Sequence, residues 1–152
     1  MRRAIGTAGQ IILGALLLVT GTAHLTFARA EFRAQVPSWL PVDDDVVVVA
    51  SGVVELCLAV ALLVTWRQPA RGVVGAVTAA FFVAVLPGNI AQFTGHRDAF
   101  GLDSDAARAV RLLGQPLLVL WALAVTSAVT TLRSLLQRVI RSCRSVRRRP
   151  GR

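Results

Sequence analysis

Four long apolar stretches set this sequence apart from that of a water-soluble protein. Each holds few or no charged side chains and is close to the roughly 20 residues that a helix needs to cross the hydrocarbon core of a bilayer. They cover residues 8–27, 46–66, 72–92 and 112–132. Because lipid offers the backbone no hydrogen-bond partners, such stretches have to be helical. We therefore predict an all-α fold in which residues 1–132 form one membrane domain, a four-helix transmembrane bundle.

The arginines predict how these helices are oriented. The formal net charge is +9, carried by 17 arginines and no lysine. Two arginines precede the first stretch, two lie in the link 67–71, and eight follow residue 132, whereas the other two connections mix arginines with acids. Loops that stay in the cytoplasm accumulate arginine and lysine. We therefore predict a bacterial cell-membrane protein with both termini in the cytoplasm, and no nucleic-acid partner.

Residues 133–152 are predicted to form a basic cytoplasmic tail. Arginines alternate there with apolar residues at helical spacing. The apolar set is Leu132, Leu135, Leu136, Val139, Ile140, Cys143 and Val146. Such a basic amphipathic helix is suited to the inner membrane surface, where it would bind anionic lipid. The alternative is a cytoplasmic continuation of the fourth helix that binds a partner protein.

Small residues indicate where helices could approach each other. Gly72, Ala76 and Ala80 recur at a spacing of four in the third stretch, as do Gly75 and Ala79. Small faces let helices pack closely in lipid. The general abundance of alanine and glycine in this sequence would produce the same pattern.

Polar side chains within or beside the apolar stretches are the candidate functional residues, because they are costly in lipid. The set is His24, Glu55, Asn89, Gln92, Arg111 and Gln115. In the predicted orientation all of them lie in the outer half of the membrane; Glu55, for example, lies about 13 Å into its helix, at roughly 1.5 Å per residue. We therefore expect one connected polar site, in which the protonation state of Glu55 stays open.

This polar cluster admits three interpretations. Its members could simply hydrogen-bond to one another, they could bind a small molecule such as a quinone head group, or they could form a path for protons or a solute. The sequence contains no nucleophile–base pair and no nucleotide-binding fingerprint, so enzymatic activity stays open and no cofactor is assigned. Asp43, Asp44 and Asp45 could suggest a metal site, but acids at a helix start usually cap it, and we predict a cap.

Several short motifs occur in an order that resembles the DoxX-like family of small bacterial membrane proteins. They are Gly21-Thr22-Ala23-His24, Val36-Pro37-Ser38-Trp39-Leu40-Pro41, Ser51-Gly52-Val53-Val54-Glu55, Leu86-Pro87-Gly88-Asn89-Ile90 and Arg111-Leu112-Leu113-Gly114-Gln115-Pro116-Leu117. The resemblance covers roughly residues 14–123 and departs at Leu113, where the family pattern would have a proline. The arginine-rich tail lies outside it.

The resemblance implies a four-helix membrane bundle and a link to quinone-dependent redox complexes. We accordingly expect a non-catalytic or accessory subunit of a membrane redox complex, with a redox partner protein. The alternatives are a quinone-linked oxidoreductase subunit and a small-solute or proton transporter acting as a homo-oligomer.

The first apolar stretch also has the layout of a signal peptide. Arg2 and Arg3 precede an apolar centre, and Gly21-Thr22-Ala23 resembles a cleavage site. Because the first family-like motif continues past Ala23 to His24, we favour a retained helix.

Overall fold

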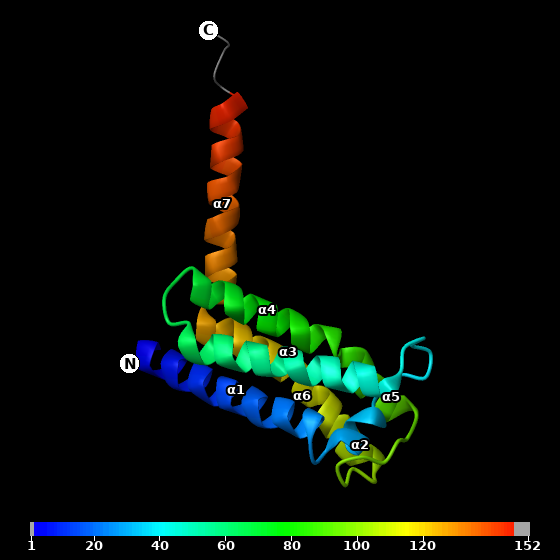
Figure 1. Cartoon of the computed structure of the whole chain (residues 1–152). Helices are drawn as coiled ribbons and strands as arrows, with labels where there is room; N and C mark the ends of the chain where they lie inside the picture. Colours follow the sequence, from blue (N-terminus) through cyan, green and yellow to red (C-terminus); the bar gives the residue numbers. More distant parts are fainter. Residues whose placement is uncertain (1, 148–152) are drawn as a thin grey trace.

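The computed structural model describes residues 2–147, and their side chains from Ile5 to Cys143. Within this range the regular structure is entirely helical, which confirms the predicted all-α class. The helices are α1 (Arg2–Leu25), α2 (Arg29–Arg33), α3 (Asp44–Val64), α4 (Ala70–Ala84), α5 (Leu86–Thr94), α6 (Asp105–Thr126) and α7 (Ala128–Arg147) (Figure 1). Among these residues, four helical segments are long and apolar enough to cross a membrane: α1, α3, α4 with α5, and α6.

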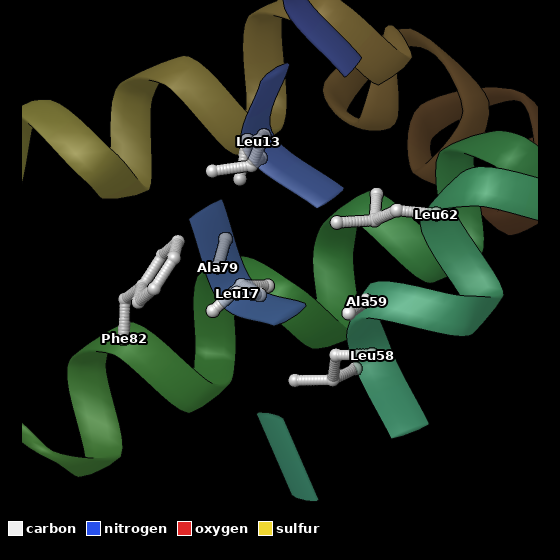
Figure 2. Packing of buried hydrophobic residues seen from close by; sticks show 8 residues of the cluster. Leu13, Leu17, Leu58, Ala59, Leu62, Ala79 and Phe82 are labelled. Carbon is white, nitrogen blue, oxygen red and sulfur yellow. The ribbon is translucent and has the colours of Figure 1, made fainter. Parts of the chain in front are cut away.

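The four segments pack side by side. Helix α1 lies along α3 and α4 lies along α6, while α1 also contacts α6 and α3 contacts α4. Their shared core contains Leu13, Leu17, Leu58, Ala59, Leu62, Ala79, Phe82 and Ala122 (Figure 2). Large apolar side chains also cover the outside of the helices, as expected for surfaces that face acyl chains.

The two ends of the molecule differ in character. The N-terminus, the link between α3 and α4, and the junction of α6 with α7 lie at one end, which we call the basic end (Figure 1). Helix α2 and the connection between α5 and α6 lie at the other, which we call the capped end (Figure 1). The basic end carries arginines and no acid, whereas seven of the eight acids belong to the capped end.

Close backbone approaches fix the helix pairs. A Cβ atom added to Gly75 would overlap the Thr126 hydroxyl and lie 2.5 Å from the Thr126 Cβ. One added to Gly52 of α3 would lie 2.7 Å from the Cβ of His24 in α1, and one added to Gly21 would lie 3.0 Å from the Gly52 carbonyl oxygen. The pairs α4–α6 and α1–α3 therefore depend on glycine at their crossing points.

The fourth span begins at Asp105 and ends at Thr126, so the predicted bounds of 112 and 132 are displaced. At its start the Ser104 hydroxyl caps the helix by accepting from the Ala107 amide at 3.3 Å. At its end Ser127 adopts a left-handed conformation, with φ of 57°. The predicted bounds therefore omit the charged first turns of α6 and run through the break at Ser127.

The third span is interrupted near its capped end. Helix α4 ends at Ala84 and α5 begins at Leu86, with Pro87 in the first turn of α5. Proline lacks the amide hydrogen that would continue the α4 ladder, but it fits the first turn of a new helix. The Pro87-Gly88 pair therefore breaks the helix and lets it restart directly.

Candidate functional site

His24 and Glu55 meet where α1 and α3 approach most closely. The His24 Nδ1 lies 3.5 Å from the Glu55 Oε2, and the residues are only 7% and 8% exposed. The same Nδ1 lies 2.9 Å from the Thr20 carbonyl oxygen. Because a carbonyl oxygen only accepts, this hydrogen bond requires a proton on Nδ1. Gly21 and Gly52 position the pair by letting the two backbones touch.

Arg111 approaches the same place from α6. Its Nε donates to the Asn89 Oδ1 at 3.2 Å, and its guanidinium lies 4.6 Å from the centre of the Phe100 ring. Phe100 contacts Phe32 edge-on, and the Phe32 ring stacks on the His24 imidazole. A continuous column of rings and one cation therefore joins the end of α1 to the start of α6.

A cavity of about 570 Å³ adjoins this column, and His24, Phe32 and Arg111 contribute to its lining. Its polar lining comes from Thr20, His24, Glu55, Arg111 and Gln115. The remaining lining residues are mostly leucine or aromatic, so the cavity combines an apolar wall with a few polar groups. This is the usual composition of a site for a small organic ligand.

The cavity has a rim in the surface between α1 and α6. Leu16 of α1 is 38% exposed and Leu117 of α6 is 66% exposed, and both line it. This surface belongs to the outside of the membrane-length helices. The cavity is therefore open toward the region that acyl chains would occupy.

Two acceptor atoms at the cavity are buried without a hydrogen-bond partner among the described residues. They are the Glu55 Oε2 and the Gln115 Oε1. Buried polar atoms are normally paired, and leaving one unpaired costs roughly 1–3 kcal/mol. Because both residues line the same cavity, a bound molecule with hydrogen-bond donors would satisfy them.

Side-chain contacts join the segments of the capped end. Arg97 donates to the carbonyl oxygens of Ala34 and Val36 at 3.1 Å and 2.7 Å. The Phe100 amide donates to the Glu31 carboxylate at 2.5 Å. Two residues outside this contact, Arg108 and Asp98, are also paired, at 2.8 Å. The Arg97 and Glu31 contacts tie α2 and the residues after it to the connection between α5 and α6, and the Arg108–Asp98 pair ties that connection to α6.

The aspartate run at residues 43–45 serves as a helix start. The Asp43 carboxylate accepts from the amides of Asp45 and Val46 at 2.8 Å and 3.3 Å, which confirms the predicted cap. Asp45 pairs with Arg29, and this hydrogen bond raises the pKa of Arg29 above its ordinary value. No group of three or more His, Cys, Asp or Glu side chains suited to a metal ion occurs in the part of the chain that the structure describes.

The structure brings most of the predicted polar residues together. His24, Glu55, Arg111 and Gln115 line the cavity, and Asn89 is connected to it through Arg111. Gln92 lies apart: its Oε1 accepts from the Gln35 Nε2 at 2.9 Å, and the side chain is 1% exposed beneath the capped end.

One buried polar group near the basic end was missed. Gln10 is fully buried in α1 and donates to the carbonyl oxygens of Leu62 and Thr65 at 2.6 Å and 2.9 Å. It satisfies acceptors at the end of α3, where the helix ladder stops. The rule that selected His24 also applies to Gln10, which is polar and within the first stretch. Gln10 lies outside the set of six predicted site residues, toward the opposite end of α1 from His24.

A family profile described as a domain of unknown function (DUF8561) matches residues 13–126. The chain belongs to this family. The DUF8561 match ends at the last residue of α6, so it contains all six predicted site residues and excludes α7. No curated protein matches the chain, and no solved structure does.

Proposed function

We propose that this DUF8561 protein is a multi-pass membrane protein that binds the polar head of a lipid-soluble molecule in the cavity between α1 and α6. The observation that carries the proposal is the pair of unpaired buried acceptors, on Glu55 and Gln115, in a largely apolar cavity open toward the lipid side. A lipid-soluble ligand could enter sideways from the bilayer between Leu16 and Leu117.

Quinols and quinones fit this chemistry. The two hydroxyl groups of a quinol would donate to the Glu55 and Gln115 acceptors, and an oxygen of either form would accept from Arg111. The head group would fill the polar part of the cavity, while the isoprenoid tail would leave through the rim into the bilayer. The resemblance to the DoxX-like family points to the same ligand class.

The charge distribution supports a four-helix transmembrane bundle with both termini in the cytoplasm of a bacterial cell. In the sequence, 12 of the 17 arginines precede residue 8, lie in the link 67–71 or follow residue 132, and the acids belong to the capped end or to α3. The positive-inside rule then places the basic end in the cytoplasm. In this orientation the cavity lies in the outer half of the membrane.

Cysteine labelling tests this orientation. In a Cys57→Ser, Cys143→Ser background, a cysteine at Ser38 should react with a membrane-impermeant maleimide on intact cells. A cysteine at Gln137 should react only after the cells are permeabilised. Both positions are exposed, so burial would not hide either one. The reverse pattern would contradict the proposed orientation.

Tryptophan fluorescence tests ligand binding. Trp121 lines the cavity, whereas Trp39 and Trp66 do not. Quinones quench nearby indoles, so a Trp39→Phe, Trp66→Phe variant should show saturable quenching by a short-chain quinone. A Trp39→Phe, Trp121→Phe variant, which keeps only Trp66, is the matched control and should show only weak, linear quenching. Equal quenching in the two variants would exclude the cavity as the quinone site.

An accessory role agrees with the residues present. Oxidation of a bound quinol needs an electron acceptor, and we propose that a partner protein supplies it. A DUF8561 subunit that holds the quinol near such a partner accounts for the cavity without assigning a reaction to this chain.

A further inference from the structure

Helix α7 leaves the other helices at a fixed point. It starts at Ala128, directly after the left-handed Ser127. Ala128 and Thr131 of its first turn are buried, and the Thr131 hydroxyl donates to the Gln68 Oε1 at 2.8 Å. Gln68 also donates to the Thr126 carbonyl oxygen at 2.7 Å. The start of α7 is therefore attached to the link between α3 and α4.

Beyond this attachment α7 runs steeply across the direction of the spans (Figure 1). It does so at the basic end, where the spans stop. If the spans are roughly perpendicular to the bilayer, α7 runs roughly along its surface. The break at Ser127 thus converts the fourth span into a helix parallel to the membrane.

The two faces of α7 differ in polarity. One face carries large apolar side chains that are exposed because nothing in the described chain covers them. These are Leu132, Leu136, Val139 and Ile140, and we call them the α7 apolar stripe. Arg138 and Arg141 are also exposed and fall on the other side of the helix, and the exposed Arg133 borders the stripe beside Ile140. This arrangement is typical of helices that lie in the membrane interface.

We propose that α7 lies in the cytoplasmic leaflet, with the α7 apolar stripe among the acyl chains and its arginines bound to anionic phospholipid head groups. The helix would thereby fix the depth of the α3–α4 link and of the α6 end at the membrane surface. This role is independent of what the cavity binds.

The charges of α7 favour lipid over the other possible occupants. From Thr126 to the end of the chain there are eight arginines and no acid. A second copy of α7 would therefore be repelled. An acidic partner protein would match the arginines but would leave the α7 apolar stripe uncovered on the other face. An anionic bilayer surface matches both faces together.

Two label positions on opposite faces test the proposal in the full-length protein. Cys143 continues the spacing of the α7 apolar stripe and is exposed, so it can carry an environment-sensitive fluorophore in a Cys57→Ser background. Gln137→Cys, in a Cys57→Ser, Cys143→Ser background, places the same label on the other face. The protein is inserted into phosphatidylcholine vesicles with and without added phosphatidylglycerol, and each label is exposed to lipid-borne and aqueous quenchers.

We expect the Cys143 label to be embedded in vesicles that contain phosphatidylglycerol, and the Gln137→Cys label to stay in water. An Arg133→Gln, Arg138→Gln, Arg141→Gln variant should lower the ratio of embedded to water-exposed Cys143 label about 100-fold, at roughly fivefold per arginine. All three arginines are exposed, so the variant should keep the wild-type unfolding midpoint.

Several outcomes would overturn the proposal. One is that both labels remain in water whatever the lipid. Another is that both are shielded equally with and without phosphatidylglycerol, as pairing between copies would produce. A triple variant that behaves like the wild type would also overturn it.

Discussion

Replacing Gly75 by alanine is expected to destabilise the protein by about 2 kcal/mol or more. The new methyl group would overlap the side chain of Thr126, whose Cβ would lie 2.5 Å away. Thr126 cannot easily rotate aside, because it is fully buried and its hydroxyl donates to the Ala122 carbonyl oxygen at 2.7 Å. Relief would require α4 and α6 to separate. Thermal unfolding in mild detergent, followed by circular dichroism, measures the loss.

Gly114→Ala provides the matched control. Gly114 also lies within a membrane-length helix, but apart from its chain neighbours and the adjacent backbone of α6 no atom lies within 4 Å of the position its Cβ would take. Glycine is a weaker helix former than alanine by roughly 0.8–1.0 kcal/mol, so this variant should be as stable as the wild type or slightly more stable. If Gly75→Ala were equally well tolerated, the close packing of α4 against α6 would be wrong.

Replacing Gly52 by alanine is expected to weaken ligand binding about tenfold, the effect of losing one hydrogen bond of roughly 1.4 kcal/mol. The added methyl would lie 2.7 Å from the Cβ of His24. His24 would be pushed away from Glu55, and its ring would lose its position against Phe32. Quinone titration of the variant that keeps only Trp121 measures the change in affinity.

Gly114→Ala also serves as the control here, because it distinguishes displacement of His24 from a simple loss of cavity volume. Gly114 lines the cavity, yet an alanine there would contact none of the surrounding atoms, so Gly114→Ala should bind nearly as well as the wild type. A Gly52→Ala protein with unchanged affinity would show that His24 does not contribute to the site. An equal loss in both variants would point to lost volume as the cause.

The number and approximate position of the spans could be predicted from the sequence because they depend only on apolar length. The ends of the fourth span could not. They depend on the Ser104 cap, on the pairing of Arg108 with Asp98 and on the left-handed Ser127, none of which changes the local hydropathy. The glycine crossings were anticipated only in part: Gly75 was identified as part of a small face, whereas Gly52 was not.

The candidate site could be predicted in part, because polar residues within apolar spans can be recognised in the sequence. Depth along each helix could be counted, and this selected Glu55, Arg111 and Gln115, which do line one cavity. The direction in which each side chain points around its helix axis could not be derived from residue numbers in the same way. Gln92, one turn from Asn89, therefore joins Gln35 and stays outside the cavity. The cavity rim at Leu16 and Leu117 could not be predicted either, because in the sequence both residues look like ordinary lipid-facing leucines.

Native mass spectrometry of the protein released gently from its own membrane tests the central claim most directly. We expect one lipid-soluble molecule with hydroxyl or carbonyl groups per chain. A Glu55→Leu, Gln115→Leu variant, which removes both unpaired acceptors, should fold and insert but lose that molecule. A wild-type chain that carries only bulk phospholipid, or a variant that retains the molecule at wild-type occupancy, would contradict the account.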